Sequence, residues 1–307
     1  MLRLLLLLLL PLTSFAQLTD YRVFSGRSGN RLILRSWKEG STSLYWGVDV
    51  QTLETSILTE ARPISPGEKE TWLAQTPYGK ALRKEYQRDG SLQDAGIERA
   101  DTTERGFHLT MDLCPSHKPL TRSLFEELIA AFGPEERPIP VTITITGLWM
   151  QAHADDLAWL KNLQTKGLLE ITWVNHSFHH RYDPKLPLTA NFLLEKGTDL
   201  NQEVLLNEQA MLQKGLLPSI FFRFPGLISD KAVFDRILDL GLLPLGSDAW
   251  LAKGEAPKQG SVVLIHPNGN EPLGIKKFIE LVKQHSTDIR HKNWLLYELP
   301  ADVSKQN

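Results

Sequence analysis

The sequence predicts an α/β protein whose larger part is an incomplete or distorted (β/α) barrel, with a small β-rich N-terminal domain or extension. From residue 106 onward, short apolar runs alternate with segments of helical periodicity, a pattern typical of parallel βαβ units. Five of these runs end in polar residues, which the strands of a barrel would bring together at one end. An open doubly wound sheet would instead gather such residues beside one switch point.

The N-terminal region is predicted to be an antiparallel meander. Its apolar or alternating runs are separated by glycine-containing turns and lie at residues 21–24, 31–37 and 43–50. Pro63, Pro66 and Gly67 then mark a break in the chain. Residues 69–87 resemble a helix interrupted near Pro77. The polar segment that follows places a boundary near residue 100, which gives an N-terminal domain over 17–100 and a barrel over 101–303.

Seven strands and about five helices are expected in the barrel region. The strands are rich in Leu, Ile, Val, Phe and Trp, as expected where helices cover both faces of a sheet. We place the strands at 106–113, 141–149, 169–175, 220–224, 242–247, 261–266 and 294–299. The apolar side chains of the first helix recur at helical spacing. The helices are placed at 120–132, 155–166, 200–215, 230–240 and 273–285.

Charge and composition exclude some classes of protein. The chain of 307 residues has 34 basic and 36 acidic side chains and a formal net charge of −2, so nucleic-acid binding has no electrostatic support. Residues 1–16 combine a positive start, an apolar stretch and small residues, as in a secretory signal peptide, and the stretch is shorter than the roughly 20 residues of a membrane span. We therefore expect an exported protein, periplasmic or extracellular, with no membrane anchor after cleavage. Cys114 is the only cysteine, which excludes an internal disulfide.

Two histidines and an aspartate suggest a metal site. His176 and His180 are four residues apart, and one helical turn would place both imidazoles on one face. Imidazole suits zinc and its first-row neighbours. Asp112 is then either a further ligand or the general base for a metal-activated water. Alone, the histidines also fit a polar surface loop, and Asp112 fits a cap of the following turn.

Four further residues at strand ends complete a candidate site. His266 could protonate a leaving group near neutral pH, and Asp248 could orient its imidazole. Arg223 could hold ionised Asp112 through bidentate hydrogen bonds and keep the pKa of that carboxyl low. Trp250 would wall the site or stack on a sugar ring. A structural histidine, a plain salt bridge and core packing are the alternatives for these side chains.

The order of these motifs resembles that of the polysaccharide deacetylases, the NodB-homology domain of carbohydrate esterase family four. The five motifs read Thr110-Met-Asp-Leu-Cys-Pro115, His176-Ser-Phe-His-His180, Arg223-Phe-Pro225, Asp248-Ala-Trp250 and Leu264-Ile-His266. The resemblance spans about residues 106–300, roughly two thirds of the chain. It implies a distorted (β/α)7 barrel, a divalent metal that is often zinc, and hydrolysis of an N- or O-acetyl group on a polysaccharide or oligosaccharide.

The resemblance also implies a role for each matching residue. It makes His176 and His180 metal ligands, Asp112 the base, His266 the acid, Arg223 the partner of Asp112, and Asp248 the partner of His266. We add Asp112 as a possible third ligand and assign Trp250 and Pro225 to substrate binding.

One departure from the family pattern concerns the metal. The position of the family's second aspartate, its third metal ligand, is Leu113 here, and Cys114 replaces the usual glycine. Three outcomes stay open: Asp112 becomes the third ligand, His117 or water fills the position, or the site has lost its metal. We therefore expect a secreted, metal-dependent deacetylase-like hydrolase, with a non-catalytic glycan-binding relative as the alternative. An amide hydrolase acting on a non-sugar substrate is a third, weaker hypothesis.

Overall fold

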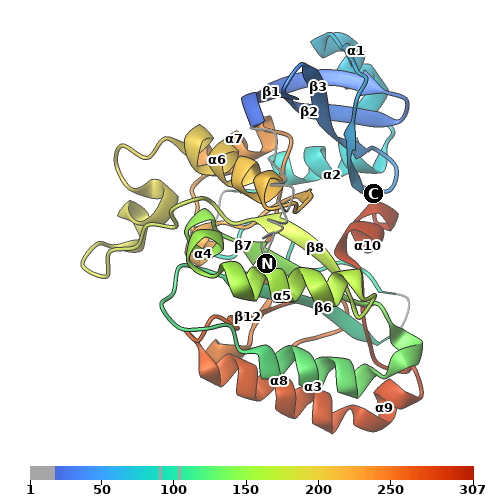
Figure 1. Cartoon of the computed structure of the whole chain (residues 1–307), viewed down its shortest axis with the longest axis vertical. Coiled ribbons are helices and arrows are strands. Elements are labelled where there is room, and N and C mark those ends of the chain that lie inside the picture. The colour runs from blue at the N-terminus through green and yellow to red at the C-terminus, as the bar shows by residue number, and fades with distance from the viewer. Residues whose placement is uncertain (1–17, 90–91, 103–104) are drawn as a thin grey trace, which may run out of the picture.

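The computed structural model describes residues 18–89, 92–102 and 105–307, and the expected signal peptide lies outside these residues. A five-stranded antiparallel sheet of order β4-β3-β2-β1-β5 lies beside a parallel sheet of order β10-β9-β8-β7-β6-β12-β11, and β13 pairs with β6 (Figure 1). Helices surround the parallel sheet. The predicted α/β fold, a distorted (β/α)7 barrel with an N-terminal β-rich part, is thus confirmed.

The N-terminal part is the predicted meander followed by two short helices. Its elements are β1 (Leu18–Ser28), β2 (Arg31–Glu39), β3 (Thr42–Asp49), β4 (Thr55–Leu58), β5 (Arg62–Pro63), α1 (Pro66–Leu73) and α2 (Pro77–Tyr86). The predicted interruption near Pro77 is present, since α1 ends at Leu73 and α2 begins at Pro77. Ser65 and Thr76 cap the two helices through their side-chain oxygens, and a proline follows each cap.

The barrel alternates strands with helices nearly as predicted. Its first half contains β6 (Gly106–Leu113), α3 (Arg122–Phe132), η1 (Pro134–Glu136), β7 (Ile139–Ile145), α4 (Gly147–Ala152), α5 (Ala154–Thr165), β8 (Leu169–Asn175), η2 (Leu188–Ala190), η3 (Phe192–Leu194) and α6 (Leu200–Gln213). Its second half contains β9 (Pro218–Phe222), η4 (Pro225–Leu227), α7 (Lys231–Asp239), β10 (Leu243–Pro244), β11 (Ala249–Trp250), η5 (Leu251–Lys253), β12 (Val262–Ile265), α8 (Pro272–Gln284), α9 (Ser286–Arg290), β13 (Leu295–Leu296) and α10 (Leu299–Lys305).

Three predicted strands are shorter than expected. The run 141–149 leaves the sheet at Ile145 because Thr146 caps α4, accepting a hydrogen bond from the Trp149 amide at 3.2 Å. The run 242–247 contributes only two residues to the sheet, and 294–299 contributes two before α10 begins. These runs are apolar because they are buried.

Strand β6 divides its side chains between two environments. Phe107, Leu109, Met111 and Leu113 belong to the hydrophobic core between the sheet and helices such as α3 and α8. The alternate residues His108, Thr110 and Asp112 are buried on the opposite face, toward the barrel interior. This two-residue period is inherent to a strand, and it directs polar groups inward along the whole length of β6.

The segment 93–99 bridges β10, at one edge of the parallel sheet, and the chain just before β12, which lies next to the other edge strand, β11. Ile97 forms a parallel bridge with Leu245 after β10, and Arg99 forms an antiparallel bridge with Ser261 before β12. The Val262 amide donates to the Glu98 carbonyl at 2.9 Å. A stretch that the sequence predicts to be part of a polar linker therefore helps to close the barrel. The domain boundary near residue 100 stays a prediction.

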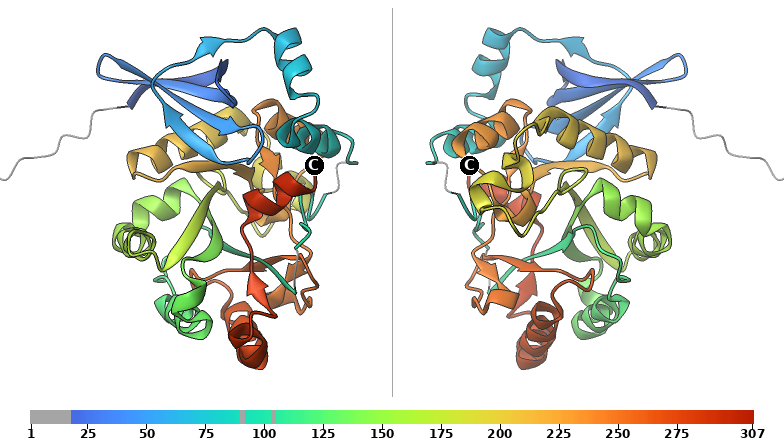
Figure 2. Two further views of the ribbon diagram at one scale, coloured as in Figure 1. Left: turned by 90° about the vertical axis from the view of Figure 1, so that its right-hand side faces the viewer. Right: turned by 90° about the vertical axis from the view of Figure 1, so that its left-hand side faces the viewer.

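The N-terminal sheet and the barrel share one hydrophobic cluster. Leu32 and Trp46 of the N-terminal sheet are buried with Phe222, Phe234 and other residues of the barrel half that contains β9, α7 and β10. Figure 2 shows the sheet lying across this side of the barrel, near α6 and α7. The packing explains how this small sheet is stable, because its buried face is covered by the barrel.

A buried ion pair lies within the same contact. Arg35 Nε and Nη2 donate to the two carboxylate oxygens of Glu208 on α6 at 2.7 and 2.8 Å, and neither side chain is exposed. The Tyr21 hydroxyl donates to the same carboxylate at 2.9 Å, and Arg35 Nη1 donates to the Leu240 carbonyl at 2.8 Å. The charges are thus paired and hydrogen-bonded, as burial requires.

We expect Glu208→Leu to lower the free energy of unfolding by about 3–5 kcal/mol, because it leaves the Arg35 charge buried without a partner. Urea denaturation followed by circular dichroism measures this change. The control is Asp235→Asn, which breaks an exposed pair with Lys231 and should cost at most about 1 kcal/mol. Equal effects of the two variants would contradict the prediction. Adding Arg35→Met to Glu208→Leu should recover much of the loss.

Candidate functional site

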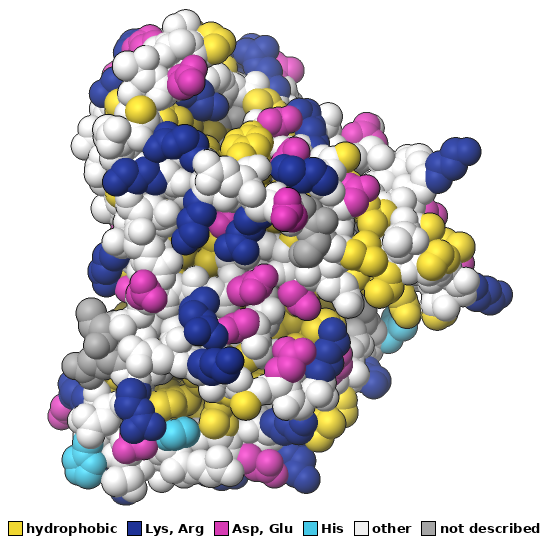
Figure 3. Space-filling model, turned by 180° about the vertical axis from the view of Figure 1, so that it is seen from behind, with side chains coloured by type: hydrophobic (Ala, Val, Ile, Leu, Met, Phe, Trp, Pro, Cys, Tyr) yellow, Lys and Arg dark blue, Asp and Glu magenta, His cyan; other side chains and the backbone are white. Residues whose placement is uncertain are grey.

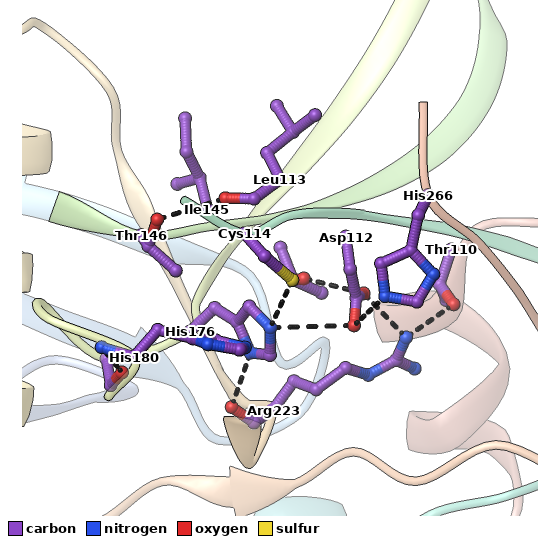
Figure 4. A network of polar contacts seen from close by, with 12 residues as sticks. Thr110, Asp112, Leu113, Cys114, Ile145, Thr146, His176, His180, Arg223 and His266 are labelled. Atoms are coloured by element: carbon purple, nitrogen blue, oxygen red, sulfur yellow. Dashed lines mark hydrogen bonds and ion pairs between the residues drawn. The ribbon is translucent and has the colours of Figure 1, made fainter. Parts of the chain in front are cut away.

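Five polar side chains lie together where parallel strands of the barrel end (Figure 4). They come from the ends of β6, β8, β9 and β12 or from the residues that follow, and they are Asp112, Cys114, His176, Arg223 and His266. Four of these are residues that the sequence predicts as site residues. The fifth, Cys114, is one that sequence reasoning did not assign.

The carboxylate of Asp112 is held on one side and free on the other. Oδ1 accepts hydrogen bonds from the Thr144 hydroxyl at 2.7 Å and from Arg223 Nη1 at 2.9 Å. Oδ2 faces the Nε2 atoms of His176 at 3.6 Å and His266 at 3.9 Å. These two distances are longer than hydrogen bonds, and so Oδ2 has room for a further partner.

Arg223 does not bind Asp112 in the predicted bidentate manner. Only Nη1 reaches the carboxylate, and it also donates to the Thr110 hydroxyl at 2.7 Å. Nη2 donates to the Gly246 carbonyl at 2.7 Å and Nε to the Leu245 carbonyl at 3.3 Å. The guanidinium spans the barrel interior instead, because backbone carbonyls beyond β10 take its other donors.

The charges around Asp112 keep it ionised. Burial, the largest single influence, raises the pKa of the carboxyl group, whereas the positive charge of Arg223 lowers it. His176, His266 and the hydrogen bond from Thr144 act in the same direction, and the pKa of Asp112 falls to about 2. Asp112 is therefore a carboxylate at every pH at which the protein would normally work.

The two histidines of the second motif are close together, although not for the reason that the sequence suggests. Residues 176–180 form no helical turn. The chain turns sharply instead, with φ of 65° at Ser177 and 49° at His180, and the two imidazole centroids lie 4.8 Å apart. The Ser177 amide is held by Asn175 Oδ1 at 3.0 Å.

Both imidazoles are set up to act as neutral ligands. The Arg223 carbonyl lies 2.9 Å from Nδ1 of His176, and because a carbonyl only accepts, Nδ1 carries the proton and Nε2 keeps its lone pair, with Cys114 Sγ 3.5 Å away. Burial lowers the pKa of His176. Burial and the neighbouring His176 lower the pKa of His180 to about 3. Metal binding requires the neutral form of histidine.

A carboxylate on α6 holds the turn that carries these histidines, and sequence reasoning missed it. Glu203 Oε2 accepts from the amides of Phe178 and His179 at 3.1 and 2.9 Å, and Oε1 lies 2.6 Å from His179 Nδ1. His179 therefore faces away from the cluster. The signal in the sequence is weak, because Glu203 is one of several polar residues on an ordinary helix.

Glu271, not Asp248, is the acidic partner of His266. Nδ1 of His266 lies 2.8 Å from Glu271 Oε2 in an ion pair with poor hydrogen-bond alignment, and the same oxygen accepts from Trp250 Nε1 at 2.8 Å. Burial by itself raises the pKa of Glu271, but its interactions with His266 and Trp250 together lower that pKa. Glu271 comes from the segment between β12 and α8, where the sequence showed no motif.

Asp248 lies at the other end of the strand that precedes His266. Its carboxylate accepts from Arg99 Nη2, Ser261 Oγ and the Val262 amide at 2.6, 3.1 and 3.2 Å. These partners precede or begin β12, whereas His266 follows it. The rise of a strand separates such positions by about 13 Å. The predicted role of Asp248 as the partner of His266 is therefore wrong.

The two residues assigned to substrate binding differ in position. The Trp250 ring is partly exposed, lies 5.5 Å from the His266 ring and has the Lys253 ammonium 3.7 Å from its centroid. It lies beside the cluster, and its contact with substrate stays a prediction. Pro225 is buried in η4, and this position gives its predicted contact with substrate no support.

The donor atoms near Asp112 fit a metal ion. One ligand atom each of Cys114, His176 and His180 lie within 4.8 Å of one another, and so do those of Asp112, Cys114 and His266. The Nε2 atom of His180 is buried and has no hydrogen-bond partner among the described residues, an uncommon state for such an atom. His117 is exposed and belongs to neither group. The residues present thus suit the metal that the resemblance implies.

A hollow of about 710 Å³ lies elsewhere, next to Thr55, Trp173 and Ser219 near the opposite ends of β8 and β9. It contains none of the residues of the cluster.

The fold defines the protein as a distorted (β/α)7 barrel, and solved structures that resemble it include carbohydrate esterases. No protein-family profile matches the sequence. A family 4 carbohydrate esterase from Bacillus anthracis is 17% identical, with a TM-score of 0.51, and the match covers 75% of this chain and 92% of that one. The family 4 carbohydrate esterase PdaA of Bacillus subtilis is also 17% identical, with a TM-score of 0.51 and coverages of 74% and 89%.

A looser likeness is that to BA3943 of Bacillus anthracis, described as a CE4 family pseudoenzyme. It is 12% identical, with a TM-score of 0.45, and the match covers 93% of this chain and 89% of that one. The two esterases above confirm the predicted resemblance to carbohydrate esterase family four at the level of the fold.

The low pKa of Asp112 predicts how stability depends on pH. The folded value of about 2 lies below the ordinary value of about 3.9, so ionised Asp112 stabilises the fold above about pH 4 and loses this effect as the pH falls. In metal-free protein, the free energy by which wild type exceeds Asp112→Asn should shrink by about 2–3 kcal/mol between pH 7 and pH 2. Urea titrations with a chelator present measure this difference, with Asp235→Asn as control. A pH-independent difference would refute the assignment.

Proposed function

We propose that the protein is an exported, metal-dependent hydrolase that removes acetyl groups from a glycan. The observation that carries the proposal is the Asp112 carboxylate, which Arg223 holds ionised 3.6 Å from His176 and 3.9 Å from His266. The fold shared with carbohydrate esterases supports the reaction class. Residues 1–16 support export. No helix among the described residues is long and apolar enough to span a membrane.

The metal would be held by His176 and His180, with Cys114 or Asp112 as a further ligand. When bound, a divalent ion such as zinc supplies Lewis-acid polarisation of the acetyl carbonyl and lowers the pKa of water.

Two side chains of the cluster, Asp112 and His266, would each carry out one proton transfer. As water adds to the acetyl carbonyl carbon, Oδ2 of Asp112 takes its proton. A carboxylate with a pKa of about 2 is a weak base, and so it suits a water molecule that is already acidified. His266 then gives a proton through Nε2 to the leaving nitrogen or oxygen as the bond to the acetyl carbon breaks. The products are acetate and a free amine or hydroxyl group on the sugar.

An exposed apolar surface beside the cluster supports an extended substrate. The segment 181–199 projects from the molecule, and hydrophobic side chains gather on it between lysine and arginine residues (Figure 3). Tyr182, Leu186 and Leu188 are exposed on this segment. The Tyr182 ring stacks on Phe192 at 5.2 Å, and Phe192 lies 5.5 Å from the His180 ring. Exposed apolar patches often mark surfaces that bind partners or ligands, and this one adjoins the cluster through Phe192.

Acetate release tests the proposal. Purified protein supplied with zinc should release acetate from at least one member of a panel of N- and O-acetylated oligosaccharides. Asp112→Asn should reduce the rate by at least about 100-fold, because general acid–base catalysis contributes about 10²–10⁴-fold. Asp235→Asn, an equal change on the surface, should leave the rate unchanged. A protein that binds these glycans in calorimetry without releasing acetate would instead be the non-catalytic relative that Leu113 favours.

Replacing Glu271 should lower the catalytic rate, whereas replacing Asp248 should not. Glu271→Gln is expected to lower kcat/KM by about 10–100-fold, the usual cost of losing a partner that orients a functional histidine, and to move the alkaline limb of the pH–rate profile to lower pH. Asp248→Asn, the matched control, should leave the profile in place because that carboxylate serves Arg99 and Ser261. A shift in the control but not in Glu271→Gln would restore the role predicted from the sequence.

A further inference from the structure

We propose that Cys114 is the third protein ligand of a thiolate-containing metal site that it forms with His176 and His180. The inference rests on the proposed function only in that it expects a metal at this cluster. It answers the question that Leu113 raises, because it identifies the side chain that takes over from the missing carboxylate.

The register of β6 places Cys114, and not Leu113, at the cluster. Asp112 and Cys114 are two residues apart and so lie on one face of the extended chain. Leu113 points to the other face, where it is fully buried in the hydrophobic core with Ile145 (Figure 4). In this register the side chain at position 113 points away from the two histidines. The ligand position has therefore moved along the chain by one residue.

The distances fit one ion bound by all three side chains. Sγ of Cys114 lies 3.5 Å from Nε2 of His176. With Zn–S of about 2.3 Å and Zn–N of about 2.0–2.1 Å, tetrahedral coordination separates a sulfur and a nitrogen ligand by about 3.5–3.6 Å. The ligand atom of His180 lies within 4.8 Å of the other two. A small inward movement of the His180 ring would complete the set.

The nitrogen atoms are available for this purpose. Hydrogen bonding to the Arg223 carbonyl fixes the proton of His176 on Nδ1, so that the Nε2 lone pair points toward Sγ. The buried Nε2 of His180 has no hydrogen-bond partner among the described residues. A metal would satisfy both atoms, and it would convert the Cys114 thiol to a thiolate with loss of one proton.

The other candidate set, Asp112, Cys114 and His266, also contains Cys114 but fits less well. Asp112 already accepts two hydrogen bonds through Oδ1, and using Oδ2 as a ligand would remove the base. It would also leave the buried Nε2 of His180 without a partner. Assigning His180 to the metal resolves both conflicts.

A thiolate with two imidazoles determines which ions the site prefers. Soft sulfur ligands favour zinc over magnesium or manganese, which prefer oxygen ligands. The charge contributed by the ligands is the same as that of one carboxylate and two histidines. The substitution therefore changes the softness of the site and not its charge.

Cobalt(II) is the probe, since it occupies zinc sites and shows a sulfur-to-metal charge-transfer band in the near ultraviolet when a thiolate is bound. Because Cys114 is the only cysteine, such a band in the full chain can come only from this residue. We expect one cobalt per chain with this band, and displacement of the band by zinc. Cobalt bound without the band would overturn the proposal.

Variants separate the ligands without reference to turnover. Cys114→Asp should bind cobalt without the band, and Cys114→Ala and His180→Ala should each weaken zinc binding by more than about 100-fold, because even an outer partner is worth about 10–100-fold. His266→Gln and the core variant Leu113→Ile should keep both band and affinity. Loss of the band in His266→Gln with retention in His180→Ala would overturn the proposed ligand set. Circular dichroism confirms that each variant is folded, and normal metal binding without acetate release would reject only the proposed function.

Discussion

The arrangement of the site depends on one buried guanidinium. Arg223 donates to Asp112 and Thr110 of β6 and to the carbonyls of Leu245 and Gly246 beyond β10, so it connects opposite parts of the barrel through its interior. Its own carbonyl orients His176. A charge in this position is tolerable only because every one of these acceptors is in place. Arg223 thus promotes the ionisation of Asp112 through its side chain and fixes the tautomer of His176 through its backbone carbonyl.

The sequence predicted the strands of the barrel well where they are long and periodic. It predicted them poorly where an apolar run is buried but does not pair with a neighbouring strand. The run over 169–175 became β8 with the same bounds, because both of its ends carry turn signals. The run over 242–247 is just as apolar, yet only Leu243 and Pro244 pair with β9, and after them the segment 93–99 supplies bridges instead. Pairing between segments so distant in the chain cannot be predicted from local hydrophobic periodicity.

The site was predictable to the extent that it follows strand order. Asp112, His176, Arg223 and His266 end parallel strands, and this placement alone brings them together. Cys114 was overlooked, although the two-residue alternation of β6 places it on the same face of the chain as Asp112. Glu203 and Glu271 could not be found in this way, because each reaches its histidine from a helix or loop. Asp248 was misassigned because the order of the motifs along the chain does not show which end of β12 its side chain faces.

The contact between the N-terminal sheet and the barrel also determines when the chain can fold. Arg35 and Glu208 are separated by 173 positions, and Trp46 donates to the carbonyl of Pro218. A ribosome delivers β1–β5 long before α6, β9 and α7 exist, so the apolar face of the sheet has nothing to cover it during most of synthesis. Contacts of such long range form slowly, and nascent chains of this kind expose strand edges that aggregate. Because of this order of elements, β1–β5 are the first strands to be synthesised but among the last to gain their full set of contacts.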